Sequence, residues 1–350
     1  MSLTATLAPP ERPVADAPYD SISDLDFPTP DLQPVSEPKA KTRRAAFRFE
    51  AEAPRKRHSN LTHSKGSWPF AFPILIVFVF MLLIPLVQSI WYSFTDRNTF
   101  TGSANFVGLD NYVRIFNEPA MIQGITFTLI FTIATTILIT VLSIPLALVL
   151  NKKFAGRAFV RTAFFFPAVP SAAVLGLVWG FILNPLSSGA FNQVLGWLGA
   201  GPIPWLANPS WARISIILVA LWGATGWHSI LYLSFLQSIP KEYYEAASVD
   251  GATGWKAFRH ITLPLLTPCI AISTLLLVTG GLRVFDMPFT LTGGGPGFAT
   301  RTITHSLIQS GIQRGEIGAA SALGVIFFLV TGVILFIQLV VNKRLEARNS

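Results

Sequence analysis

The stretch of the chain best suited to recognition chemistry runs from Glu245 to Pro264, between two long apolar segments. It begins Glu-Ala-Ala-Ser-Val-Asp-Gly and combines helix-forming residues with small side chains. An otherwise apolar chain retains such a polar, helix-forming stretch where another protein must hold it. We therefore interpret Glu245–Pro264 as a docking element.

Capping and turn residues divide this stretch into two short predicted helices. Pro240 suits a first helical turn, and Glu242 lies where a carboxylate meets the positive end of the helix dipole. Small and aromatic side chains follow in the next turn, namely Tyr243, Tyr244, Ala246 and Ala247. Gly251 then allows the chain to bend. A second helix over 255–260 is expected to end before Pro264, because proline disfavours helix in the preceding residue.

A plain amphipathic connector is the alternative interpretation of this loop. The loop, 237–264, has about 28 residues, whereas the preceding turn on the same side needs only about nine. That excess length favours a helix-turn-helix at the membrane surface.

Motifs for catalysis are absent from the sequence. It contains no Gly-x-x-x-x-Gly-Lys-Ser/Thr loop, no His-Glu-x-x-His and no Gly-x-Ser-x-Gly. The single Cys269 lies in an apolar segment, which excludes disulfides and cysteine-based metal sites. Histidines are scattered without ligand spacing, at His58, His63, His228, His260 and His305. The sequence thus predicts no metal site, no cofactor bound by this chain and no enzyme activity.

Four residues inside apolar segments are candidates for a substrate pathway, and each also has a purely structural interpretation. Arg283 lies roughly 27 Å along a helix counted from Leu265, near the outer interface, and shares a helical face with Asp286. The two form either a self-paired interfacial couple or a polar lining of a substrate pathway. Trp222 and Trp227 similarly serve either as packing residues or as aromatic surfaces for sugar rings.

The composition identifies a multi-spanning membrane protein. Of 350 residues, 51% are hydrophobic and only 13% are charged, against roughly 25% charged in a soluble domain. A spanning helix needs about 20 mostly apolar residues. Long charge-free intervals, and one interval that holds only Arg283 and Asp286, predict six helices, near 69–94, 123–150, 160–183, 212–236, 265–290 and 317–341.

Basic residues set the expected orientation. Twenty Lys and Arg residues fall on the side of both termini and of the 237–264 loop, and five fall on the opposite side. The positive-inside rule therefore places both termini and the loop in the cytoplasm. Contact with the lipid bilayer explains the net charge of +8, so no nucleic-acid partner is needed.

Residues 1–65 differ from the rest of the chain. They contain nine prolines and show no sustained helical or strand period, so we expect a disordered cytoplasmic tail ahead of a transmembrane domain over 66–350. Its basic second half is expected to act as a juxtamembrane anchor, with a specific partner site as the alternative.

Several motifs together carry a resemblance to a known family. Glu245-Ala-Ala-x-x-Asp-Gly-Ala, with Leu263-Pro264 behind it, resembles the EAA loop of ABC-importer permeases. Further stretches are similar to the maltose-type, carbohydrate-uptake branch, namely Asn105–Tyr112, Phe165–Pro167, Ser238–Pro240 and Phe285–Pro296. The resemblance covers about residues 66–350.

This resemblance implies a fold, partners and site residues. The fold would be the type I ABC importer permease fold, in a bacterial-type cytoplasmic membrane. The partners would be a second homologous permease, a cytoplasmic ATPase dimer that uses ATP and Mg, and an extracytoplasmic solute-binding protein facing segments 95–122, 184–211 and 291–315. The ATPase-coupling residues would be Glu245, Ala246, Ala247, Asp250, Gly251, Leu263 and Pro264, with Glu245 as a charge partner of the ATPase.

The predicted function is therefore translocation of a sugar or related carbohydrate. Disaccharides, oligosaccharides, monosaccharides and glycerol 3-phosphate all fit the resemblance. An ion-coupled carrier or channel is the alternative, although Asp286 is the only acidic residue inside a predicted span. An intramembrane enzyme is disfavoured, because no catalytic set lies at helical spacing in the spans.

Overall fold

The computed structural model describes residues 68–252 and 254–349, which form helices joined by turns. Within these residues the only β-type pairing is an isolated antiparallel bridge between Thr95 and Phe106. The expected all-α class is therefore confirmed. The tail predicted over 1–65 lies outside the described residues.

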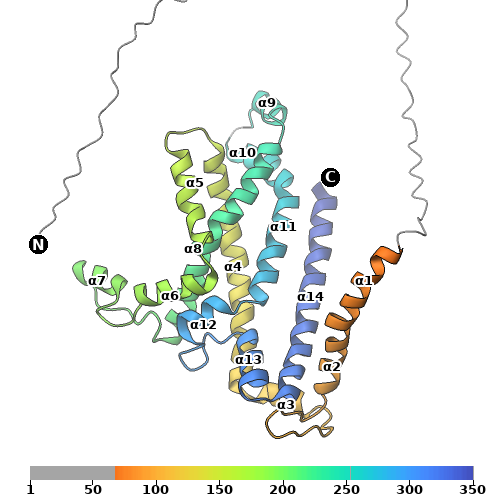
Figure 1. Ribbon diagram of the computed structural model, residues 1–350. Helices are drawn as coiled ribbons and strands as arrows, with labels where there is room; N and C mark the ends of the chain where they lie inside the picture. Colours follow the sequence, from red (N-terminus) through yellow and green to blue (C-terminus); the bar gives the residue numbers. More distant parts are fainter. Residues whose placement is uncertain (1–67, 253, 350) are drawn as a thin grey trace, which may run out of the picture. The chain divides into compact units, whose positions relative to one another are not determined.

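The helices follow the chain from one end of a bundle to the other and back (Figure 1). In chain order they are α1 (Trp68–Phe78), η2 (Val79–Leu83), α2 (Ile84–Tyr92), α3 (Asp110–Asn117), α4 (Pro119–Asn151), α5 (Arg157–Phe165), η3 (Phe166–Ala168), α6 (Ala172–Ile182), α7 (Ala190–Trp197), α8 (Pro209–Ser238), α9 (Glu242–Val249), α10 (Trp255–Ala257), η4 (Phe258–Thr262), α11 (Leu263–Leu282), α12 (Asp286–Thr292), α13 (Ile303–Ile308), η5 (Gln309–Gln313) and α14 (Ile317–Asn349).

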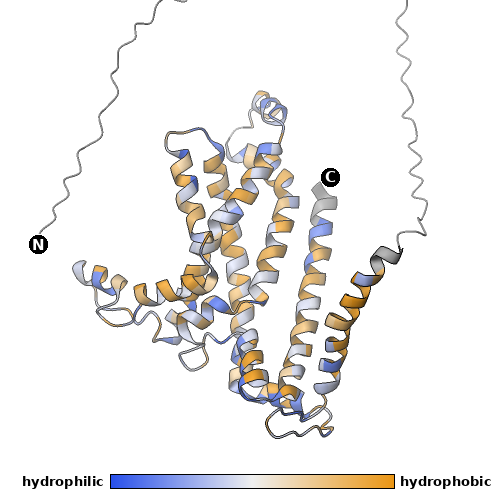
Figure 2. Cartoon of the chain, in the orientation of Figure 1, coloured by the Kyte–Doolittle hydropathy of each residue, from blue (hydrophilic) through white to orange (hydrophobic). Residues whose placement is uncertain are grey.

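Five helical segments of the described chain are long and apolar enough to cross a membrane, and there are six if the bent pair Arg157–Ala168 and Ala172–Ile182 counts as one span. Hydrophobic residues cover these long helices, whereas hydrophilic residues collect at α9 and around α3 (Figure 2). The central windows of the first and last segments, within Phe72–Tyr92 and Ile317–Arg344, contain no buried residue. The surfaces of these two windows are therefore available to lipid or to another chain, whereas Ala319, Ala322 and Leu323 in the first turns of α14 are buried in a hydrophobic cluster.

Two prolines are accommodated in long helices by the same local device. A π-helical turn ends two residues before Pro85, and another ends two residues before Pro264. Proline lacks an N–H and crowds the preceding turn, and a π-helical adjustment lets the freed backbone groups find other partners in the bilayer.

This device corrects one expectation from the sequence. The helix that begins at Trp255 does not end before Leu263-Pro264 but continues as one segment of 28 residues to Leu282. Leu263, the residue before the proline, keeps α-helical dihedrals (φ −65°, ψ −44°), so the preference against helix before proline is overridden here.

The predicted helix over 160–183 is not straight. Between Ala168 and Ala172 the chain turns by 98°, so that α5 and α6 run in different directions. Pro167 and Pro170 interrupt the hydrogen-bond ladder there, and the Ser171 side chain accepts a hydrogen bond from the Val174 backbone N–H to start α6.

The predicted helix over 265–290 is also wrong in its second half. α11 ends at Leu282, Arg283–Phe285 are non-helical, and α12 begins at Asp286. Gly280 and Gly281 weaken the end of α11, and the packing of α12 against α6 buries Met287.

Glycines allow the central helices to approach closely, as small residues do in membrane bundles. A Cβ at Gly226 of α8 would lie 1.8 Å from the carbonyl oxygen of Phe164 in α5. A Cβ at Gly281 of α11 would lie 2.9 Å from Thr132 Oγ1 in α4. Backbone proximity at these two points packs α4, α5, α8 and α11 into one unit.

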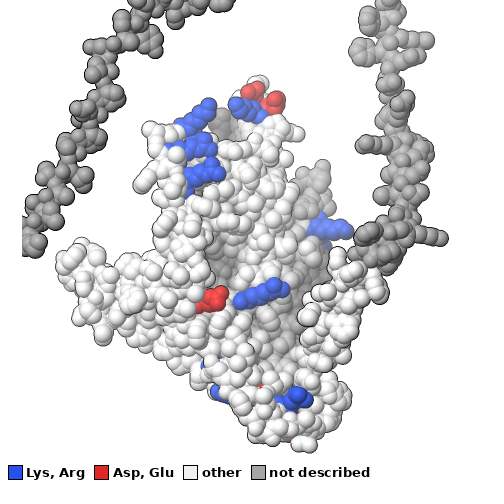
Figure 3. Space-filling model, viewed as in Figure 1, with Lys and Arg blue, Asp and Glu red and all other residues white. Residues whose placement is uncertain are grey.

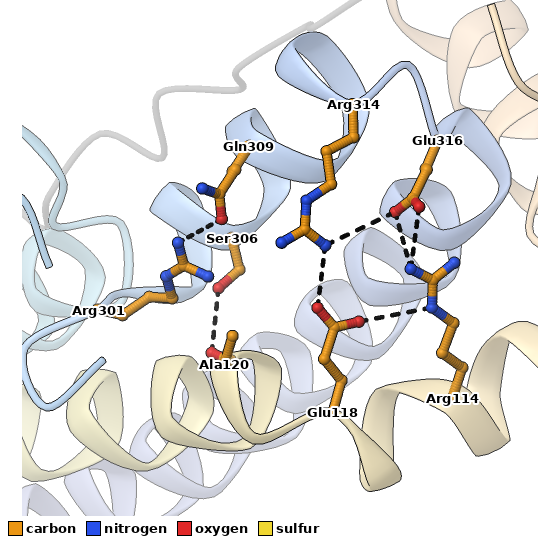
Figure 4. A network of polar contacts seen from close by, with 8 residues as sticks. All are labelled: Arg114, Glu118, Ala120, Arg301, Ser306, Gln309, Arg314 and Glu316. Atoms are coloured by element: carbon orange, nitrogen blue, oxygen red, sulfur yellow. Dashed lines mark hydrogen bonds and ion pairs between the residues drawn. The ribbon is translucent and has the colours of Figure 1, made fainter. Parts of the chain in front are cut away.

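Ion pairs close the end of the bundle that carries α3 and α13 (Figure 4). Arg114 donates through Nη2 to both oxygens of Glu316 at 3.0 Å, and Arg314 donates through Nη1 to Glu118 at 3.0 Å. Arg114 also lies 3.5 Å from Glu118. Single exposed pairs contribute only about 0–1 kcal/mol each, but this network fixes the start of α14 against the start of α4.

We expect Gly226→Ala to lower the melting temperature of the detergent-solubilised protein by several degrees, because a carbonyl oxygen in a packed helix cannot move away from the added methyl group. The matched control is Gly280→Ala, since no atom lies within 4 Å of a Cβ at that position. Equal melting temperatures for the two variants would contradict the close contact of α5 with α8.

Candidate functional site

The predicted docking element forms a short helix that projects from one end of the bundle. α9 extends beyond the ends of α5, α8 and α11 (Figure 1). Glu242 and Glu245 both lie in its first turn, where carboxylates stabilise the helix dipole. Acidic side chains are visible at this end of the molecule in the space-filling view (Figure 3).

Few contacts hold α9 to the bundle. Ala247 is the one residue of α9 that is buried. The Tyr244 hydroxyl lies 3.0 Å from Thr262 Oγ1, a hydrogen bond that joins α9 to η4. The Ala252 N–H donates to the Ala247 carbonyl at 2.8 Å and closes the end of the helix. α9 is therefore attached to the base of α11 through one small side chain and one hydroxyl pair.

The turn after α9 depends on glycine. Gly251 has a φ of +72° and Gly254 a φ of +55°, conformations that residues with a Cβ rarely adopt. No atom of the described chain lies within 4 Å of a Cβ built at Gly251. The requirement for glycine at this position is therefore conformational, and the space around it is open to another protein.

The seven predicted coupling residues separate into two groups. Glu245, Ala246, Asp250 and Gly251 are exposed, and the two carboxylates form no ion pair within the described residues. Ala247 is buried, whereas Leu263 and Pro264 lie at the start of α11, where Leu263 is exposed and Pro264 is half-buried. The structure thus brings four of the seven to one exposed surface.

A cavity of about 410 Å³ lies between α4, α6, α8, α11 and α12. Its walls are mostly apolar, with Trp227 and His228 from α8 among the lining residues. Small residues widen it, chiefly Gly223, Ala224, Gly280 and Gly281. A concave apolar site with a few polar groups is typical of small-molecule binding.

His228 is the functional candidate that sequence reasoning missed. Its side chain is 5% exposed, and its Nδ1 lies 2.8 Å from Ser273 Oγ of α11. The Trp227 ring lies edge-on to the imidazole, with ring centroids 4.7 Å apart. The sequence signal is a polar residue beside a tryptophan inside an apolar span. A criterion based on metal-ligand spacing does not detect it, because His228 has no second histidine nearby in the sequence.

The four predicted pathway residues lie in different surroundings. Trp227 lines the cavity, whereas Trp222 packs edge-on against Trp179 with ring centroids 5.3 Å apart. Arg283 and Asp286 flank the break between α11 and α12, next to the lining residues Val284 and Met287, and are not lining residues themselves. No ion pair joins Arg283 to Asp286, because the helix that would align them ends at Leu282.

Two titratable side chains, His305 and Arg301, are buried at the end of the bundle opposite α9. The pKa of His305 is lowered by burial and further by the neighbouring Arg301 guanidinium, so the imidazole is neutral at neutral pH. Arg301 donates to the Gln309 side-chain carbonyl and stacks over Phe298. In the described part of the chain, no group of three or more His, Cys, Asp or Glu residues is arranged to hold a metal ion.

Comparison with known proteins places relatives over most of the chain. Residues 139–347 match the family described as "Binding-protein-dependent transport system inner membrane component". A probable starch degradation products transport system permease protein, AmyD of Thermoanaerobacterium thermosulfurigenes, is 31% identical over 80% of this chain and 94% of its own length. The trehalose/maltose transport system permease protein MalF of Thermococcus litoralis is 33% identical over 76% of this chain and 90% of its own length.

Solved structures show the same arrangement of helices. A chain from a bacterial ABC transporter involved in the import of the acidic polysaccharide alginate superimposes with a TM-score of 0.71 at 27% identity. The match covers 81% of this chain and 98% of that one. The same type of transporter, in complex with an alginate pentasaccharide-bound periplasmic protein, matches with a TM-score of 0.71 at 26% identity.

We expect Tyr244→Phe to increase amide hydrogen exchange in α9, because the substitution removes the hydroxyl that bonds to Thr262. Tyr243→Phe is the matched control, since the Tyr243 side chain is 54% exposed. Deuterium uptake followed by mass spectrometry measures both variants. If α9 exchanges equally fast in the two, the hydroxyl pair does not hold α9 to the bundle.

Proposed function

The chain belongs to the family of binding-protein-dependent transport system inner membrane components, among its sugar permeases, and from this we propose that it is the membrane-spanning subunit of an ATP-driven sugar importer. The type I ABC importer permease fold and the multi-pass membrane character expected from the sequence are confirmed.

The observation that carries the proposal is the exposed α9 turn. Glu245 and Asp250 present charge, Ala246 and Gly251 allow close approach, and few bundle contacts compete for them. Such a surface suits insertion into a cleft of a cytoplasmic ATPase subunit, with Glu245 pairing with a basic side chain there. The sequence has no phosphate-binding loop, so ATP and Mg are bound by the ATPase dimer and not by this chain.

α9 is connected to the cavity wall through η4 and α11, so a movement of α9 can be transmitted to the cavity. Tyr244 and Thr262 join α9 to η4, and the helix continues without a break from Trp255 to Leu282. Leu276, Leu277, Gly280 and Gly281 near its far end line the cavity. Closing and opening of the ATPase pair would therefore move this cavity wall as a rigid body and expose the cavity alternately to the two sides.

The distribution of basic residues gives the orientation of the protein in the membrane. The α9 end of the bundle faces the cytoplasm in this proposal, and the distribution of Lys and Arg predicts the same side of the membrane for both chain termini. The outer segments 95–122, 184–211 and 291–315 would receive an extracytoplasmic binding protein, in line with the periplasmic protein bound to the solved alginate transporter. The unburied surfaces of the first and last spans would contact a second permease and lipid.

The cargo in this proposal is a saccharide. The relatives are named for starch degradation products and for trehalose and maltose, and the solved structures for alginate. In the cavity, the Trp227 ring offers an aromatic face to a sugar ring, and the His228 imidazole offers a hydrogen bond to a hydroxyl. Arg283 and Asp286 at the α11–α12 break would contact the sugar only as it enters or leaves.

We expect Glu245→Lys and Gly251→Trp each to reduce sugar uptake about tenfold or more, because they disturb a charged contact and an open, left-handed turn. Membrane insertion should be unchanged, since neither side chain packs in the bundle. Uptake is measured in cells that produce the complete importer, together with ATPase activity of the purified complex. Glu242→Lys on the same helix is the control for charge reversal, and wild-type uptake in both test variants would exclude the coupling role.

We expect Trp227→Ala to raise the KM for uptake roughly tenfold, because it removes an aromatic wall of the cavity. Trp222→Ala is the matched control and should lower the melting temperature while leaving KM unchanged, since Trp222 packs against Trp179. Maltose, trehalose and malto-oligosaccharides serve as test sugars. An unchanged KM for Trp227→Ala with every transported sugar would remove this residue from the substrate site.

A further inference from the structure

The turn between α4 and α5 carries a dense group of positive charges. α4 ends at Asn151 and α5 begins at Arg157, with Gly156 in a left-handed conformation at φ +84° between them. Four basic residues lie in and beside this turn, namely Lys152, Lys153, Arg157 and Arg161. We call these four residues and the turn the basic hairpin.

No acidic side chain neutralises the basic hairpin. The sequence contains no Asp or Glu between Glu118 and Glu242. Within the described residues none of the four basic side chains forms an ion pair. Basic side chains gather over this part of the surface without acidic ones among them (Figure 3). The positive charge of the hairpin is therefore available to an anion.

Within the described chain, the N-terminus of α5 also has no negatively charged side chain beside it. The first turn of α5 contains no acidic residue and no side-chain cap, and it begins with Arg157 at the positive end of the helix dipole. Arg157 and Arg161 are four residues apart, so two like charges share one face of the helix. The contact of Arg157 with the positive end of the helix dipole and the repulsion between Arg157 and Arg161 both raise the free energy of the isolated chain. An anion bound beside the turn would offset both with favourable electrostatic interactions.

Aromatic side chains in the same hairpin are exposed to the surroundings. Phe159 is 77% exposed and Phe154 is 39% exposed. Phenylalanine beside Lys and Arg is the combination expected where a polypeptide meets the boundary between headgroups and acyl chains. The hairpin also lies closer to the body of the bundle than α9, which projects past it (Figure 1).

We propose that the basic hairpin binds the headgroup of an anionic phospholipid in the cytoplasmic leaflet. The Arg157 and Arg161 guanidinium groups donate hydrogen bonds to the phosphate, Lys152 and Lys153 add charge, and Phe159 inserts between acyl chains. The site requires the cytoplasmic orientation given above, but it does not depend on the cargo or on the ATPase.

The test compares lipid association in nanodiscs that contain equal parts of phosphatidylcholine and phosphatidylglycerol. Spin-labelled phosphatidylglycerol and spin-labelled phosphatidylcholine report, by electron paramagnetic resonance, the preference of the purified full chain for the anionic lipid. We expect Arg157→Gln/Arg161→Gln to reduce this preference by roughly fivefold for each charge removed. Arg157→Lys/Arg161→Lys should retain most of it, which controls for misfolding.

The matched control is Lys343→Gln/Arg344→Gln, which removes two exposed charges from the same side of the membrane at the end of α14. Its preference should remain near that of the unmodified chain. An equal loss in both double variants would mean that only the general surface charge attracts lipid, and no loss in either would mean that the hairpin holds none. Displacement of the labelled lipid by inorganic phosphate at constant ionic strength would assign the hairpin to a free anion. Each of these three results overturns the proposal.

Discussion

The absence of water in the hydrocarbon core is the constraint on which the rest of this structure depends. Every backbone N–H and C=O in a span must find its partner within the protein, which makes long helices the default. Prolines then become the places where the chain must adjust. Pro85 and Pro264 are absorbed by π-helical turns that keep a helix continuous, whereas Pro167 and Pro170 end one helix and start another at 98°.

The departures from straight helices contribute to the walls of the cavity. The α5–α6 bend contributes Pro167 and Pro170 to the cavity wall, and the region of the α11–α12 break contributes Gly281 and Met287. Two straight helices in their place would pack against α4 and α8 and leave less space. Interruption of the helices therefore contributes residues of both breaks to the cavity wall.

Stability is distributed unevenly between the bundle and α9. The bundle is joined by backbone approaches at Gly226 and Gly281 and, at the end with α3, by a network of four charged side chains. α9 is held by one buried alanine and one hydroxyl pair between Tyr244 and Thr262. This arrangement leaves the surface of α9 exposed, while its attachment leads into the helix that runs from Trp255 to Leu282.

The sequence by itself determined the class of the protein, the approximate positions of four of the six predicted spans, and α9 with its glycine turn, whereas the spans predicted at 160–183 and 265–290 differ from the structure. These properties depend on local composition, because bilayer thickness sets the length of an apolar segment and Pro240, Glu242 and Gly251 act on their own turns. Only the tertiary structure decided the 98° bend, the break after Leu282 and the place of His228 in a cavity wall. Whether a proline or glycine interrupts a helix depends on which neighbours satisfy the freed backbone groups, and those neighbours are distant in the sequence.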